Sequence, residues 1–148
     1  MFIGFLRAGT PIAEQWAKLP IMIDALFNQP NYAGAKKMLD AAVLRQKAIA
    51  NNLAHLESPN YRRVDLSPAF ESELRHALEG RDVARINGLR PTLESDATAV
   101  ASTRDGNTVK LEDELVRMNQ NTLTHAVESQ LITGSLVKLR LAITGRSA

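Results

Sequence analysis

The chain has 148 residues, a formal net charge of +2 and no cysteine, with hydrophobic residues making up 45% of it and aromatic residues 5%. The lack of cysteine excludes disulfide bonds, thiol catalysis and thiolate metal ligands. Because the charge is small and acidic and basic residues are mixed along the chain, the composition argues against a dedicated nucleic-acid binder, which would present a basic face. No apolar run approaches the roughly 20 residues that a membrane-spanning helix needs.

The apolar residues are mostly Leu, Ile, Val and Ala, which give a thin core for a chain of this length. Buried apolar area is what offsets the entropy lost on ordering. We therefore expect the chain to become well ordered only when copies or partners cover its apolar faces.

Residues 1–34 are expected to form an N-terminal extension with short helices. Pro11 favours a helix start, Pro20 interrupts that helix, and residues 29–32, Gln-Pro-Asn-Tyr, break the chain again. The first residues lack the basic start and the long apolar core of a secretory signal, so we do not expect a cleaved signal.

Residues 35–57 predict an amphipathic helix. Small alanines flank its apolar side, so a neighbouring helix can approach closely, and the only polar member of that side is Gln46. Asn51 and Asn52 near its end have two interpretations: they fix the register of a helix interface, as buried asparagine does in coiled coils, or they are a solvated pair. The predicted stripe consists of Ala35, Leu39, Ala42, Gln46, Ile49, Leu53 and Leu56.

Ser58-Pro59-Asn60-Tyr61 then predicts a type II turn, because proline fits its second position and asparagine tolerates the positive φ of its third. The next residues, 61–65, are basic and compatible with a β-strand. Arg62 and Arg63 have two interpretations, contact with acidic surfaces of a partner or simple solubilisation.

The periodic signal weakens over residues 66–108. Ser67 with Pro68 predicts the start of a short helix and Gly80 its end. Residues 85–108 are rich in Ser, Thr, Asp, Gly and Asn and are expected to form short strands or irregular, exposed chain, with a turn at Asp105-Gly106-Asn107.

The C-terminal stretch predicts a second, longer helix with a 4-3 apolar spacing and a stop at Gly145. We interpret Glu112-Asp113-Glu114 as a solvated first turn that suits the helix dipole, since consecutive helical residues point in different directions and cannot act together in acid catalysis. The stripe runs through Leu111, Leu115, Met118, Thr122, His125, Ser129, Ile132, Leu136, Leu139 and Ile143.

Residues 50–65, ANNLAHLESPNYRRVD, resemble the N-terminal signature of the flagellar axial proteins, in which Ala-Asn-Asn-Leu-Ala-Asn leads to Thr-Pro-Gly-Tyr. The preceding LDAAVLRQKAI and residues 105–143 are similar to the proximal rod type of that family. Ser58 and Asn60 depart from the signature but preserve the turn, since one keeps the hydroxyl and the other allows positive φ. His55 replaces an amide by a ring of different reach, and Lys110 stands where an acidic residue is usual.

The resemblance implies a mainly α fold, in which long N- and C-terminal helices pack as an antiparallel coiled-coil-like pair with a small irregular or β insert between them. Four segments are expected: the extension 1–34, the axial helix and its turn 35–65, the variable insert 66–108 and the C-terminal axial helix 109–148. Rod proteins usually begin shortly before the first axial helix, so residues 1–21 are either an extension or lie before a true start at Met22.

The function that the resemblance implies is a structural subunit of the proximal rod of the bacterial flagellar basal body. Such a subunit is exported from the cytoplasm by the flagellar type III export apparatus without a cleaved signal and assembles in the periplasm. The expected partners are further copies in a helical assembly, the rod proteins FlgC, FlgF and FlgG, and the adapter FliE. The alternative from another class is a helical regulatory or nucleic-acid-binding protein that dimerises through residues 111–143.

We expect assembly, and not catalysis, from the terminal helices. No nucleophile–base pair is present and the three histidines lack metal-binding spacing, so no enzyme activity, cofactor or metal is expected. Residues 35–57 span roughly 35 Å and residues 111–144 roughly 50 Å as helices, so about a third of the second stripe must be covered by residues 12–28 or by other molecules. The residues expected to carry assembly are Leu39, Ala42, Ile49, Asn51, Asn52, Leu53, Pro59, Tyr61, Arg62, Leu115, Met118, Ile132, Leu136, Leu139 and Ile143.

Overall fold

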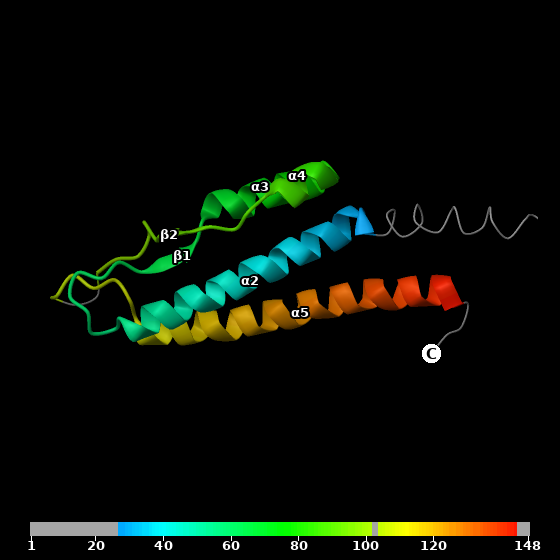
Figure 1. The fold of residues 1–148 in the computed structure, drawn as a ribbon. Helices are drawn as coiled ribbons and strands as arrows, with labels where there is room; N and C mark the ends of the chain where they lie inside the picture. The colour runs from blue at the N-terminus through cyan, green and yellow to red at the C-terminus, as the bar shows by residue number, and fades with distance from the viewer. Residues whose placement is uncertain (1–26, 102–103, 145–148) are drawn as a thin grey trace, which may run out of the picture.

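The computed structural model describes residues 27–101 and 104–144. Two long helices, α2 (Pro30–Ala54) and α5 (Leu111–Thr144), lie side by side (Figure 1). They are antiparallel, because Asn52 near the end of α2 contacts the first turn of α5 while Ala42, further back in α2, contacts Asn121, further along α5. This confirms the predicted fold class.

The insert packs against α2. It consists of α3 (Pro68–Glu79), α4 (Val83–Gly88) and a two-stranded antiparallel sheet formed by β1 (Val64–Leu66) and β2 (Leu93–Ser95). In Figure 1, α3 and α4 lie on the side of α2 that faces away from α5. The sheet register pairs Val64 with Ser95, Asp65 with Glu94 and Leu66 with Leu93. The core is small and lies between α2 and the insert: Ala33, Ala41, Leu66, Phe70, Leu74, Ala77 and Ile86.

The first long helix begins five residues before the predicted boundary at residue 35. Pro30 occupies the first helical position, and the Ala33 N–H donates to the Gln29 carbonyl at 3.0 Å. The interpretation of residues 29–32 as a break was therefore wrong for Pro30–Tyr32, because the missing N–H of proline is harmless in a first turn. The extension predicted before residue 27 lies outside the described residues.

The predicted turn after α2 is confirmed. Asn60 has a φ of 58°, and the Tyr61 N–H donates to the Ser58 carbonyl at 3.3 Å. The predicted turn at residues 105–107 lies against it, since a Cβ on Gly106 would come within 2.7 Å of the Asn60 side chain. The neighbouring Asn107 amide donates to the carbonyls of His55, Leu56 and Ser58, which lie beyond the last turn of α2. The loop between the insert and α5 thus caps the end of α2.

The insert is partly as predicted. The helix α3 begins at Pro68 and ends before Gly80, as expected, whereas β1 begins at Val64, inside the segment expected to be extended from residue 61. The helix α4 was not predicted: the Asp82 side chain accepts a hydrogen bond from the Arg85 N–H at 2.9 Å, and Ile86 is fully buried. The expectation that residues 85–108 are exposed was therefore wrong at Ile86, because one apolar residue in a polar stretch carries no periodic signal. It was also wrong at Asn107, which its contacts with the end of α2 bury.

Candidate assembly interface

The predicted stripe of α2 lies toward the interior. Ala42 and Ile49 are buried and Leu39 and Leu53 are half-buried. Gln46, its one polar member, is exposed, and its side-chain carbonyl accepts a hydrogen bond from the Asn121 amide at 3.0 Å. The α2 side of the helix pair therefore follows the spacing seen in the sequence.

The face that α5 turns toward α2 differs from the predicted one. Met118, Ile132 and Leu139 are half-buried, but Leu115, Leu136 and Ile143 are exposed, as is Leu111. The buried positions are polar and seven residues apart, each directly before a residue of the predicted stripe: Glu114, Asn121 and Glu128. The helix is thus rotated from the predicted setting, because Glu114 finds partners in Asn52 and Arg63, and Asn121 finds partners in α2, that the spacing of α5 cannot reveal.

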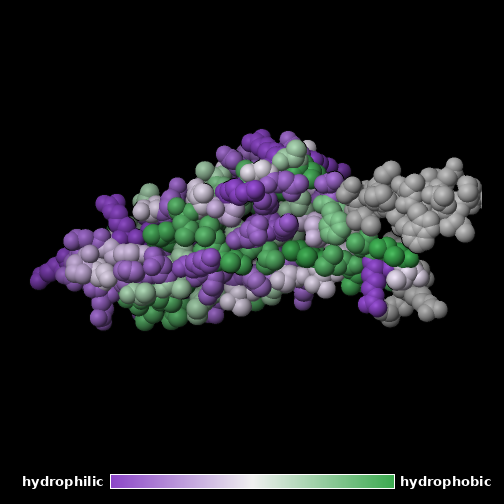
Figure 2. Space-filling view, in the orientation of Figure 1, coloured by the Kyte–Doolittle hydropathy of each residue, from purple (hydrophilic) through white to green (hydrophobic). Residues whose placement is uncertain are grey.

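The outward face of α5 carries a second stripe, which the sequence analysis missed. Its apolar members are exposed, with Leu123 reaching 68%, and its spacing alternates between four and three residues. Hydrophobic residues also gather in Figure 2 at the lower left, where α5 begins. We call this set the outward stripe: Val116, Gln120, Leu123, Val127, Gln130, Gly134, Val137 and Leu141.

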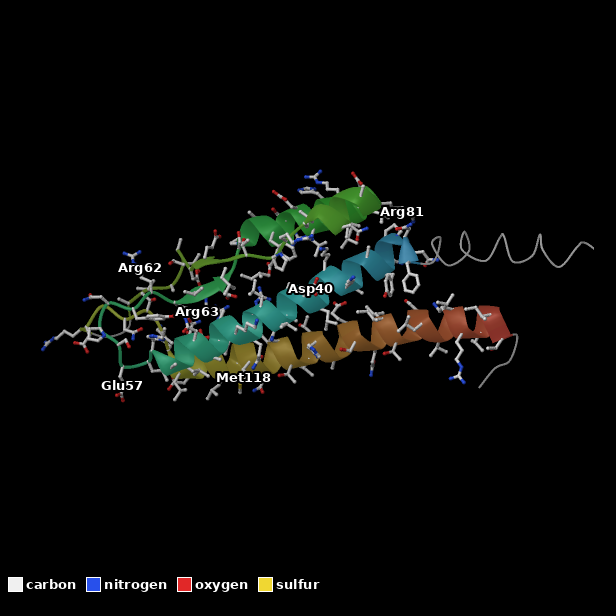
Figure 3. The ribbon with its side chains drawn as sticks, in the orientation of Figure 1. Asp40, Glu57, Arg62, Arg63, Arg81 and Met118 are labelled. Atoms are coloured by element: carbon white, nitrogen blue, oxygen red, sulfur yellow. The ribbon has the colours of Figure 1, made fainter. Side chains whose placement is uncertain are left out.

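Arg63 lies at the centre of a buried ion network. Its side chain is 4% exposed, with Nε 2.6 Å from Glu114 Oε1, Nη2 2.6 Å from Asp65 Oδ2, and Nη1 bonded to Asp96. Both interpretations of Arg63, contact with a partner and simple solubilisation, were therefore wrong. Arg62 is exposed and points away from the molecule, whereas Arg63 lies close to α2 and the start of α5 (Figure 3).

Glu114 completes this network from α5. Its side chain is fully buried, so the prediction of a solvated acidic turn holds for the exposed Glu112 and Asp113 but was wrong for Glu114. Its Oε2 accepts a hydrogen bond from the Asn52 amide at 3.1 Å. The signal that could have found this pairing was weak, since Arg63 and Glu114 are 51 positions apart in the sequence.

Asn52 connects α2, β1 and α5. Its amide donates to the Val64 carbonyl at 2.8 Å, and its carbonyl accepts from the Val64 N–H at 3.0 Å and from the Tyr61 hydroxyl at 3.3 Å. The solvated interpretation was therefore wrong for Asn52, whereas Asn51 is exposed and donates to the Tyr61 hydroxyl at 3.0 Å. The unusual His55 ring stacks on Tyr61 with centroids 4.5 Å apart. Pro59 at the turn is exposed.

Further charges surround Asp65. Its Oδ1 lies 3.1 Å from Arg45 Nε and its Oδ2 lies 3.2 Å from Arg117 Nη1. Burial acts to raise the pKa of Asp65, but hydrogen bonds from Arg63 and the Leu66 N–H, with the charge of Arg45, hold it below its ordinary value. We call Asn52, Arg63, Asp65, Asp96 and Glu114 the polar lock, because they join α2, the insert and α5.

The other buried polar groups of α5 are less well satisfied. The Asn121 amide donates to the Ala42 carbonyl at 2.9 Å, but its Oδ1 has no hydrogen-bond partner among the described residues, and neither has Oε2 of the buried Glu128. Burial raises the pKa of Glu128. From Asn121 onward, the α2–α5 contact therefore buries polar atoms whose lost hydrogen bonds to water reduce the stability of the fold.

The described part of the chain contains no cluster of His, Asp and Glu arranged to hold a metal ion. A search of the same residues found no helix with the length and apolar content needed to cross a membrane. The features that stand out are thus helix faces and polar contacts between helices.

No family model matches the chain. It is nevertheless similar to the flagellar basal body rod protein FlgB of Borrelia hermsii, with 28% identity over 112 residues that cover 63% of this chain and 80% of the relative. The FlgB proteins of Bacillus subtilis and Escherichia coli are 24% and 26% identical, covering 72% and 68% of this chain and 88% and 83% of the relatives. These similarities confirm the resemblance to rod proteins and indicate a structural role in the flagellar rod, not an enzymatic one.

Proposed function

We propose that this chain, which resembles the FlgB rod proteins over about two thirds of its length, is a structural subunit of the proximal rod. It self-associates and packs against other rod proteins through its terminal helices. The neighbours that fit this role are further copies in a helical assembly, the rod proteins FlgC, FlgF and FlgG, and the adapter FliE.

The observation that carries this proposal is the outward stripe of α5. From Val116 to Leu141 it extends for roughly 38 Å at about 1.5 Å per residue. Large exposed apolar surfaces are uncommon on monomeric proteins and mark sites of association. A surface that binds a different surface of the next copy, without closing a ring, builds an open helical filament, which is the form that a rod requires.

The location follows from the same role. A rod subunit acts outside the cytoplasm, in the periplasm, and reaches it through the flagellar export apparatus. A small core supports this route, because a chain with little buried apolar area is easily kept unfolded before export and gains stability when neighbours cover its helices.

Substitution of one stripe residue tests the proposal. Leu123→Asp places a charge on the outward stripe, and Val100→Asp places the same charge on the insert, where Val100 is 75% exposed. Both changes spare the interior. We expect Leu123→Asp to reduce incorporation into rods by at least about tenfold in cells that lack the wild-type chain, because a charge in an interface core costs several kcal/mol, and to abolish swimming.

The control Val100→Asp should assemble and swim normally. Normal swimming of the Leu123→Asp strain would remove the outward stripe as an assembly surface. Normal flagella in cells that lack the chain entirely would remove the rod role itself.

A further inference from the structure

A basic pocket lies beside the first turns of α2, where α4 ends. Its volume is about 600 Å³, and the charged side chains that line it are Lys36, Lys37 and Arg90. Tyr32 lies beside them, and its ring packs edge-on against Phe27 with centroids 5.2 Å apart. Three cations around one cavity predict a site for an anion.

Lys37 shows that this charge is not balanced within the described part of the molecule. The residue is 7% exposed, and its ammonium group makes no hydrogen bond or ion pair with any residue of 27–101 or 104–144. Burial lowers the pKa of Lys37 and the charge of Arg90 lowers it further, whereas Asp40, three residues along α2, acts in the opposite direction. A partly buried cation with no partner among residues 27–101 and 104–144 costs free energy that a bound carboxylate would recover.

The opposite end of the long axis carries carboxylates that are free to pair. Glu112 and Asp113 are exposed in the first turn of α5, and neither forms an ion pair with a described residue. Figure 1 shows the start of α5 and the start of α2 at opposite ends of the helix pair. The two sites therefore cannot meet within one chain, but they can meet between chains stacked end to end.

The geometry points to a head-to-tail contact in which the pocket of Lys36, Lys37 and Arg90 binds the carboxylates of Glu112 and Asp113 of a second copy. This inference deepens the self-association proposed above and rests on it. Because the two surfaces differ, each added copy presents a new free pocket or a new free acidic turn, so the contact does not close on itself. Apolar contacts between outward stripes do not fix how two copies are oriented along the assembly. The charged contact would fix that orientation.

Charge reversal tests this contact in the purified full chain by analytical ultracentrifugation. The pocket variant carries Lys36→Glu and Arg90→Glu, and the acidic-turn variant carries Glu112→Lys and Asp113→Lys. We expect each variant alone to associate at least about tenfold more weakly than wild type, and an equimolar mixture to recover association, because the reversed pocket then meets a reversed turn. Wild-type association should weaken as salt rises.

One control and one further pocket variant keep the outcome decisive. The variant with Arg75→Glu and Lys138→Glu changes the net charge as much as the pocket variant does and should associate like wild type. A second pocket variant, Lys37→Gln, keeps most of the stem of Lys37 in place and leaves α4 unchanged. It should therefore weaken association even if Arg90→Glu disturbs the end of α4. Circular dichroism confirms that each variant folds.

The head-to-tail contact would be overturned if both charge-reversed variants associated as strongly as wild type. It would also be overturned if both associated more weakly and the mixture did not recover association. Neither result would touch the rod role, which the swimming and incorporation tests address separately. Equal weakening by the Arg75→Glu and Lys138→Glu control would also overturn it, since net charge alone would then explain the effect.

Discussion

The two halves of the α2–α5 contact differ in how completely they are satisfied. At the end formed by the last turns of α2 and the first turn of α5, Asn52, Arg63 and Glu114 bond to one another directly or through neighbours. Further along, Asn121 and Glu128 each bury an oxygen that has no partner among the residues that the structure describes. The first half is thus closed by its own hydrogen bonds, whereas the second buries polar atoms at a cost in stability. The stabilising contacts are therefore distributed unevenly along one helix pair, and the strongest lie where α2 ends and α5 begins.

Removing Arg63 should have the largest effect on this contrast. Arg63→Ala leaves the fully buried Glu114 and the half-buried Asp65 without their shared cation. Breaking a buried ion pair from one side costs about 3–5 kcal/mol, so we expect a loss of this size in the free energy of unfolding, measured with denaturant. Arg62→Ala is the matched control and should change it by less than about 0.5 kcal/mol. Equal stability of the two variants would contradict the polar lock.

Removing the Asn52 amide should have an intermediate effect. Asn52→Ala leaves both backbone groups of Val64 and one Glu114 oxygen without their partner, which costs about 2 kcal/mol for buried polar groups. Asn51→Ala, one residue earlier, removes only an exposed contact with Tyr61 and should cost less than about 0.5 kcal/mol. Amide exchange of the β1 residues provides the local measurement. Unchanged protection there in Asn52→Ala would show that β1 is held by other contacts.

Replacing Glu128 should have the smallest effect and the opposite sign. Glu128→Leu removes a buried carboxylate, one oxygen of which has no partner in the described part of the chain, so we expect a gain of about 1 kcal/mol at neutral pH. Because burial raises the folded-state pKa of Glu128 above its unfolded value, its contribution is most favourable below the unfolded pKa and is lost as pH rises through the folded one. The wild type should therefore show this pH-dependent loss and Glu128→Leu should not.

The matched control for that prediction is Glu73→Leu on the exposed face of α3, which should leave both stability and its pH dependence nearly unchanged. At the other half of the contact the sign reverses. The pKa of Asp65 and that of Asp96 are lowered, so their contribution is present above the ordinary aspartate pKa and is lost as pH falls through the lowered values. A Glu128→Leu variant that is less stable than wild type at neutral pH would mean that the carboxylate has a partner in solution.

Sequence patterns predicted the elements whose ends have local causes. Pro68 and Gly80 bound α3, Pro59 with Asn60 forms the turn, and the length of α5 follows from its unbroken periodicity. The patterns did not predict which way α5 faces. That orientation depends on the ion pair between Arg63 and Glu114, which joins segments far apart in the sequence. A prediction of the buried face from apolar residues alone places every glutamate on the exposed side, so it could not identify Glu114 as buried.

Pro30 and Arg63 show the two ways in which local reasoning fails here. Proline both ends and begins helices, so Pro30 was assigned to a break when its neighbours place it in a first turn. Both Arg62 and Arg63 were assigned to the molecular surface. Consecutive side chains of an extended segment point to opposite sides, however, so Arg62 can be exposed while Arg63 is buried. The second error could have been avoided from the period of the strand alone.

The cap that Asn107 forms on the end of α2 affects when the chain can fold during its delivery. The hydrogen bond from Asn107 to His55 spans 52 positions of the sequence, and the bond from Arg63 to Glu114 spans 51. A chain can be delivered from its N-terminus, by a ribosome or through a narrow channel. Its first long helix then emerges before either Asn107 or Glu114 is available to make these contacts. That helix therefore stays easy to unfold until the start of α5 has emerged. The chain can pass in an unfolded form, and its tertiary contacts form only near the end of its passage.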